Sequence, residues 1–338
     1  MRAPSPFHNS LSRRGFLASA AGALGVAGLP QFGLAAPEKD RELEKKVEEA
    51  TEKGLEWLKR AQAQDGHWEG QGGAYPVAMS ALAGMAFLME GSNLKEGKYS
   101  DQIQKAVDWF LKHAQQANGL LGFNKGNDFG SYMHGHGFAT MFLACAYGEA
   151  EDKEQQQKLE KAVKKAADFC TKAQINRKHP MPEGKTVDIG GWGYTSAAEN
   201  GGGDEGSITV TQLQALRAAR NAGIAYPRKR STRQSRSSKL HTPAGGMIYS
   251  YGGGGRAAER CRTPTHRARR SPARSAPVNS LSDLARKWIK FCKEKIPIAK
   301  GRVAHDEYQN YYFGQMMYIL GETRTTATCS PRKTNRRG

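Results

Sequence analysis

The chain repeats one short segment at long and nearly regular intervals. Residues 57–62, 110–115 and 169–174 each read aromatic, apolar, two polar residues, alanine and glutamine, and they begin 53 and 59 positions apart. A weaker copy begins at Phe291, 122 positions after the start of the third, which is about two intervals. Self-similarity on this scale predicts stacked supersecondary units that each bury one face against the next.

Each copy belongs to a unit of two helices joined by a glycine-aromatic loop. The first helix is amphipathic, as over 42–64, where apolar residues recur at helical spacing. The second is apolar nearly all round, which is typical of a helix buried on both sides. These second helices are expected over 75–88, 136–147, 207–222 and 310–320, after loops at 66–68, 122–123, 190–194 and 245–249. The alternation predicts an all-α fold, an α/α toroid built as a double ring of helical hairpins and incomplete in its C-terminal third.

The glycine-aromatic loops are expected to hold neighbouring hairpins together. Gly66 is expected to adopt a left-handed conformation after the first helix and to allow a close approach by Trp68. Gln62, just upstream, is expected to satisfy backbone groups at the end of that helix. Together the three residues predict a brace that clamps one hairpin to the next.

The first copy extends to the pattern Lys53-Gly54-x-x-Trp57-Leu58-x-x-x-Gln62-x-x-x-Gly66-x-Trp68. This pattern resembles the QW motif of the prenyltransferase and squalene cyclase repeat family, over roughly residues 40–225 and 280–322. The resemblance implies a terpenoid cyclase-like α/α barrel whose relatives cyclise polyprenyl chains or transfer prenyl groups.

The catalytic motifs of such cyclases are absent from the sequence. There is no Asp-x-Asp-Asp motif, which squalene-hopene-type cyclases use to protonate an alkene, and no Asp-Asp-x-x-Asp motif. The nearest carboxylates are Asp188 and the pair Asp204 and Glu205, expected in loops at one rim as catalytic groups or as helix caps. His134 and His136, at the start of a buried helix and near Asp128, are further candidates for metal binding or acid–base chemistry, or else serve in capping and packing.

Neither zinc nor another cofactor is predicted. Residues 305–312 resemble the protein prenyltransferase helix that ends in a Tyr-His ligand pair, but Gln309 stands where that histidine would be. The expected Asp-x-Cys is missing at 204–206, where Asp-Glu-Gly occurs. The five cysteines include no Cys-x-x-Cys pair, so a cysteine-based metal or redox site is not expected.

Aromatic side chains recur in the loops and the apolar helices. Rings that face a barrel cavity stabilise cations or stack on sugars, whereas the others fill the core. The candidates for substrate binding are Trp68, Trp192, Tyr194, Tyr308 and Tyr311.

The net charge of +19 is confined to three segments. Basic residues gather in 1–37, 227–278 and 323–338, and the rest of the chain carries one more acidic than basic residue. No basic face therefore runs through the folded part, and nucleic acid is not an expected partner.

The basic segments also separate the expected helical repeats from one another. Three hairpin repeats are expected over 37–226 and a further one over 279–322. Residues 227–278, apart from a repeat-like island at 242–255, and residues 323–338 lack helical periodicity. They are either basic linkers and a basic tail or frameshifted translations of a GC-rich gene.

The N-terminus has the pattern of a bacterial export signal. Residues 12–17 read Ser-Arg-Arg-Gly-Phe-Leu, an apolar small-residue stretch extends to Leu34, and Ala35-Ala36 follows. This pattern predicts a twin-arginine signal peptide over 1–36, recognition by the twin-arginine export machinery, and a periplasmic or extracellular protein.

Three functions compete at this point. The first is a terpenoid cyclase- or prenyltransferase-like protein that binds or transforms an isoprenoid. The second is an exported carbohydrate-active toroid, a lyase or hydrolase acting on a glycan, with carboxylates such as Asp128, Asp188 and Asp204 on one rim. The third is a non-catalytic interaction scaffold.

Overall fold

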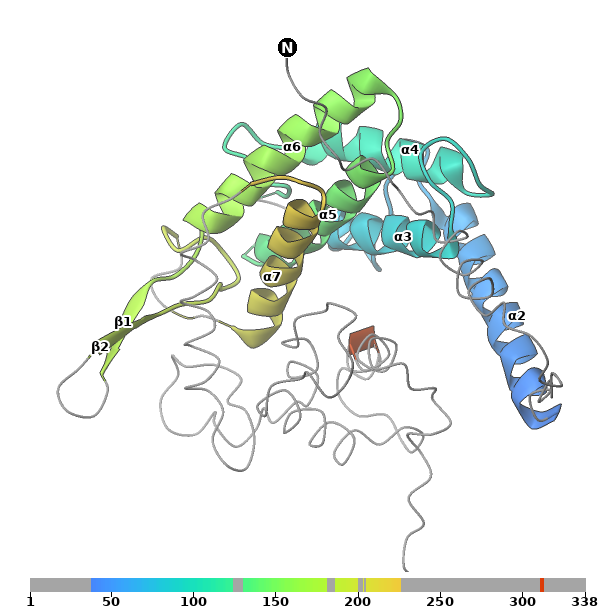
Figure 1. Ribbon diagram of the computed structural model, residues 1–338, viewed down its shortest axis with the longest axis horizontal. Helices are drawn as coiled ribbons and strands as arrows, with labels where there is room; N and C mark the ends of the chain where they lie inside the picture. The colour runs from blue at the N-terminus through green and yellow to red at the C-terminus, as the bar shows by residue number, and fades with distance from the viewer. Residues whose placement is uncertain are drawn as a thin grey trace, which may run out of the picture. The chain divides into compact units, whose positions relative to one another are not determined.

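The computed structural model (Figure 1) describes residues 38–123, 130–180, 186–199, 203, 205–225 and 311–312. The chain divides into two compact units, residues 1–53 and 54–338. The first helix begins in the first unit and ends in the second, and every other described element belongs to the second unit.

Three amphipathic helices alternate with the other helices along the chain. They are α2 (Glu38–Ala61), α4 (Ser100–Trp109) and α6 (Lys153–Lys172). In α4, Ile103, Ala106 and Val107 form the buried stripe that helical spacing predicts. A short π-helical turn, η1 (Phe110–Ala114), continues α4.

The intervening helices are α3 (Pro76–Glu90), α5 (Tyr132–Gly148) and α7 (Gly206–Asn221). Helices α3 and α5 are apolar over most of their surface, and α5 is buried almost continuously from Tyr132 to Ala146. A helix of this composition gains stability only when other helices cover it on several sides. Helix α7, which the sequence predicts to be apolar nearly all round, instead buries polar side chains such as Thr211 and Gln212 beside its apolar ones.

Helices α3, α5 and α7 form one layer, called the inner layer below, and the amphipathic helices α4 and α6 pack on it. Helix α5 lies between α3 and α7 and contacts both (Figure 1), while α4 packs on α3, and α6 packs on α5 and α7. The close approach within the inner layer depends on glycine, because a methyl group at Gly84 would lie 2.5 Å from the Phe142 ring. At Gly137 it would lie 2.8 Å from Gln212 Nε2.

A short antiparallel hairpin, which the sequence patterns did not predict, separates α6 from the loop before α7. Strand β1 (Arg177–Pro180) pairs with β2 (Thr186–Ile189), with Arg177 opposite Ile189. The hairpin returns the chain to the end of α6, where the Ile175 N–H donates to the Gly191 carbonyl at 2.9 Å.

The predicted all-α class is confirmed for the described residues, in which six α-helices carry the fold. Predicted bounds agree with the helices to within a few residues; the helix expected over 42–64 ends at Ala61 because the chain turns at 62–67. The ring closure of the toroid stays a prediction. The export signal, the basic segments and the repeat at 279–322 lie outside the described residues, apart from the helical pair 311–312.

None of the described helices combines the length and the apolar character that a membrane span requires.

Candidate functional site

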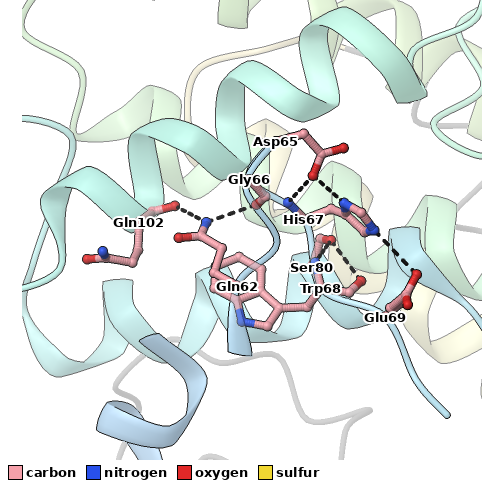
Figure 2. A network of polar contacts seen from close by, with 8 residues as sticks. All are labelled: Gln62, Asp65, Gly66, His67, Trp68, Glu69, Ser80 and Gln102. Atoms are coloured by element: carbon pink, nitrogen blue, oxygen red, sulfur yellow. Dashed lines mark hydrogen bonds and ion pairs between the residues drawn. The ribbon is translucent and has the colours of Figure 1, made fainter. Parts of the chain in front are cut away.

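The loop after α2 forms the brace that its sequence predicts (Figure 2). Gln62 Nε2 donates to the carbonyl of Gly66 at 2.9 Å and to the carbonyl of Gln102, on α4, at 3.0 Å. Trp68 is buried, and its Nε1 donates to the Leu58 carbonyl at 2.7 Å. One glutamine and one indole therefore tie the end of α2 to its own loop and to the next amphipathic helix.

The brace is also fixed to the inner layer. The Trp68 backbone N–H donates to Ser80 Oγ of α3 at 2.8 Å, and that hydroxyl donates to the Trp68 carbonyl at 3.2 Å (Figure 2). Both backbone polar groups of this buried tryptophan consequently have a defined partner, as buried polar groups require.

The second loop repeats the glutamine contact and the backbone contact of the first loop, without an indole. Gln115 Nε2 donates to the Ala162 carbonyl of α6 at 3.0 Å, as Gln62 does to α4. The backbone N–H of Leu121 donates to His136 Nδ1 at 3.1 Å, so a histidine takes the place that Ser80 holds in the first loop.

The third loop returns to tryptophan. Trp192 is fully buried, its Nε1 donates to the Cys170 carbonyl at 2.7 Å, and its N–H donates to Thr209 Oγ1 at 3.0 Å. Trp68 and Trp192, predicted to bind substrate, thus have their indole N–H groups occupied by the brace.

His136 has a structural environment. It is fully buried, its Nδ1 accepts from Leu121, and its Nε2 lies 3.2 Å from the Ala166 carbonyl, to which it donates. Burial lowers the pKa of His136 to about 3, and the hydrogen bond to Ala166 only partly opposes that shift. Because both ring nitrogens are held by backbone groups, the geometry favours His136 as an anchor rather than as an acid–base group.

The N-terminal ends of the three inner helices lie at one end of the layer. His134 Nε2, in the first turn of α5, lies 3.0 Å from Ser207 Oγ in the first turn of α7. A methyl group at Gly135 would lie 3.0 Å from Val77 in the first turn of α3. The three inner helices are therefore parallel, and their positive dipole ends point to one side.

A buried polar cluster occupies the junction of α5 and α7. Glu205 is the N-cap of α7: one carboxylate oxygen, Oε2, accepts from the Ile208 N–H at 2.9 Å and from the Ser207 hydroxyl. The second oxygen, Oε1, is buried and has no hydrogen-bond partner among the residues that the structure describes. The Glu205 N–H donates to the Trp192 carbonyl at 2.9 Å, so the third brace positions this carboxylate.

His134 contacts both this polar cluster and the exposed Tyr194. Burial lowers the pKa of His134, and the nearby Glu205 carboxylate opposes that shift without cancelling it. The Tyr194 ring meets His134 edge-on, with ring centroids 6.0 Å apart, and is itself 42% exposed. The Tyr194 carbonyl accepts from the Met133 N–H at 3.1 Å, which holds this loop against α5.

A second polar cluster lies beside the first brace. His67 Nδ1 lies 2.5 Å from Asp65 Oδ1, His67 Nε2 lies 3.5 Å from Glu69 Oε2, and the ring stacks on Trp109 (Figure 2 shows the three polar residues). Partial burial raises the pKa of the Asp65 carboxyl, but the hydrogen bonds from His67 outweigh burial and leave it lower than usual.

The structure brings some of the predicted site residues together and leaves others apart. Glu205 and Tyr194 lie around the His134 cluster. The expectation that Asp188 lies in a loop is wrong, because the chain there pairs as strand β2 and places Asp188 opposite Lys178 of β1. Tyr311 packs against the hydrophobic core. The candidates outside the described residues are Asp128, Asp204 and Tyr308.

Sequence reasoning missed Ser207 and named His134 only together with His136, for metal binding or acid–base chemistry. The available signal was a polar residue in the first turn of an otherwise apolar helix, which both residues satisfy. Among the described residues, no group of three or more histidine, cysteine, aspartate and glutamate side chains is arranged to hold a metal ion.

Comparisons with known proteins give no match: no family model fits the chain, and neither the curated proteins nor the solved structures contain a detectable relative.

Proposed function

We propose that this chain is an α/α toroid of the prenyltransferase and squalene cyclase repeat type and that it binds an isoprenoid. The observation that carries the proposal is the recurrence of brace contacts in three successive loops, in each of which a backbone N–H donates to a side chain of the following buried helix. Indoles donate to amphipathic-helix carbonyls at Leu58 and Cys170, and glutamines donate to the next amphipathic helix at Gln102 and Ala162.

The same brace supports a curved double layer. Each brace joins an amphipathic helix, a loop and a buried helix in the same relation, and the buried helices are parallel. Repeating one relation between neighbours generates a superhelix or a ring. We propose a ring with the buried helices inside.

We propose that the ligand binds at the end of the inner layer where α3, α5 and α7 begin. Two exposed tyrosines lie at the starts of inner helices: Tyr75, the N-cap of α3, is 49% exposed, and Tyr194 is 42% exposed. Tyr75 adopts a left-handed backbone with φ of 53°, a strained conformation that in proteins concentrates at functional sites. Aromatic rings beside apolar helices suit an unsaturated hydrocarbon chain.

Ligand binding to the full chain tests the proposal. Farnesyl diphosphate, geranylgeranyl diphosphate, squalene and an acidic polysaccharide are titrated separately and followed by native mass spectrometry and tryptophan fluorescence. We expect saturable binding of at least one isoprenoid, weakened by Tyr194→Ala and unaffected by Trp57→Ala, since Trp57 is an exposed aromatic on α2. Binding of the polysaccharide alone would favour the carbohydrate-active alternative, and binding of none of the four would favour the scaffold.

A further inference from the structure

One oxygen of the buried Glu205 carboxylate, Oε1, accepts no hydrogen bond from the described residues. The side chain is 6% exposed, Oε2 holds two donors, and Oε1 has none. A buried polar atom without a partner destabilises the folded chain, and more so when the group is charged, so a bound donor would relieve this penalty.

The Glu205 carboxylate lies at the positive end of the α7 helix dipole. The N-terminus of α7 and the Ile208 N–H both stabilise negative charge at Glu205. No lysine or arginine forms an ion pair with Glu205 in the described part of the chain. His134 does not supply the missing cation near neutral pH, because burial lowers the pKa of its imidazole.

The cluster lies close to the surface on the side of His134. Tyr194, whose ring meets His134 edge-on, is 42% exposed, and His134 reaches Glu205 through the Ser207 hydroxyl. The contacts from Tyr194 through His134 and Ser207 therefore have an exposed aromatic ring at one end and a buried anion at the other. This arrangement suits a small organic cation, which is attracted by both.

We propose that Glu205 Oε1 binds the ammonium group of an organic amine, with His134 and Tyr194 as the adjoining wall. The proposal goes beyond isoprenoid binding and does not depend on it. An ammonium group donates a charge-assisted hydrogen bond to Oε1, and its alkyl chain extends past Tyr194. A neutral alcohol of the same length offers the hydrogen bond without the charge, and a carboxylate is repelled.

The test uses the full chain and three probes of equal length: n-hexylamine, 1-hexanol and hexanoate, measured by isothermal titration calorimetry at a pH of about 7.5, where the amine is charged. We expect hexylamine to bind saturably, hexanol to bind at least about tenfold more weakly, and hexanoate not to bind. Glu205→Gln should weaken hexylamine binding by at least about tenfold. Glu199→Gln is the matched control, because Glu199 is an exposed carboxylate of the same loop that contacts Ser196, and it should leave binding unchanged.

Circular dichroism would reveal whether the Glu205→Gln variant fails to fold, and a second variant is used in that case. Glu205→Asp keeps the charge and is a favoured N-cap, but it withdraws the carboxylate by one methylene, so hexylamine binding should still fall. The proposal is overturned if hexylamine does not bind, if hexanol binds as tightly as hexylamine, or if folded Glu205 variants bind hexylamine like the native chain. None of these outcomes bears on isoprenoid binding, which has its own probes.

Discussion

The indole N–H of Trp192 donates to the backbone carbonyl of Cys170 at 2.7 Å, across 22 positions of sequence that include the β1–β2 hairpin. Trp68 makes the same contact with Leu58 across only 10 positions. The contact is thus kept although the intervening chain more than doubles in length. This constancy identifies the indole as the element that defines the position of the loop against the amphipathic helix.

Trp192→Phe should destabilise the fold by about 2 kcal/mol, because it removes this hydrogen bond and opens a cavity in a fully buried site. Urea unfolding followed by circular dichroism measures the change. Trp57→Phe is the control, because Trp57 is 61% exposed. This substitution should leave the urea midpoint of unfolding unchanged. Equal effects of the two substitutions would remove the structural role assigned to Trp192.

Gln62→Ala should lower the free energy of unfolding by about 1–2 kcal/mol. The substitution removes two hydrogen bonds to backbone carbonyls, one of them on α4, and leaves the carbonyls of Gly66 and Gln102 without this donor. Gln64→Ala, at an exposed glutamine two positions away, should change the unfolding free energy by less than about 0.5 kcal/mol. Thermal unfolding of the two variants side by side distinguishes a brace from a generic surface glutamine.

Gly66→Ala should be more destabilising than Gly91→Ala, although both glycines have left-handed backbone angles, with φ of 104° and 118°. A methyl group at Gly66 would clash with the Lys105 carbonyl of α4, whereas one at Gly91 would meet nothing within 4 Å. Strain alone costs about 1–3 kcal/mol, and only Gly66 adds the clash. Denaturant midpoints that rank the two variants in the opposite order would show that α4 does not lie against this loop.

His136 should make stability depend on pH in a defined direction. Burial lowers the pKa of His136 to about 3 in the folded chain, against about 6.5 when unfolded. The unfolded chain therefore binds a proton first, and stability falls as pH drops from about 6.5 to about 3, by up to about tenfold in the unfolding equilibrium constant per pH unit. His136→Gln, which keeps one acceptor and one donor, should flatten this dependence. An unchanged pH profile in a folded His136→Gln variant would contradict the assignment.

Sequence reasoning succeeded where one local rule decides the outcome. Helical spacing located α2, α3, α5 and α7, and the repeated segments at 110–115 and 169–174 marked the ends of the other two amphipathic helices. The recurring glutamine was expected to bond at the end of its own helix, whereas Gln62 and Gln115 reach the next amphipathic helix. The β1–β2 hairpin was missed because its four-residue strands carry no alternation that distinguishes them from a loop.

The candidate site was predicted only in part, because it is made by tertiary contacts. Glu205 was named as a loop carboxylate, but its meeting with His134 through Ser207 joins residues 73 positions apart and depends on how α5 packs against α7. His136 was predicted as a functional residue because it is one of two neighbouring histidines. Its position in the second brace, where the first has Ser80, becomes visible only when the loops are superposed in space.

A crystal structure of the full chain would decide whether hairpins held by one recurring brace form two nested layers. We expect α3, α5 and α7 to lie side by side and parallel, with α4 and α6 packed on their other face. We also expect the indoles of Trp68 and Trp192 to bond to the carbonyls of Leu58 and Cys170, and further hairpins to close the inner layer into a ring. Antiparallel inner helices, or indoles pointing away from those carbonyls, would contradict the nested arrangement.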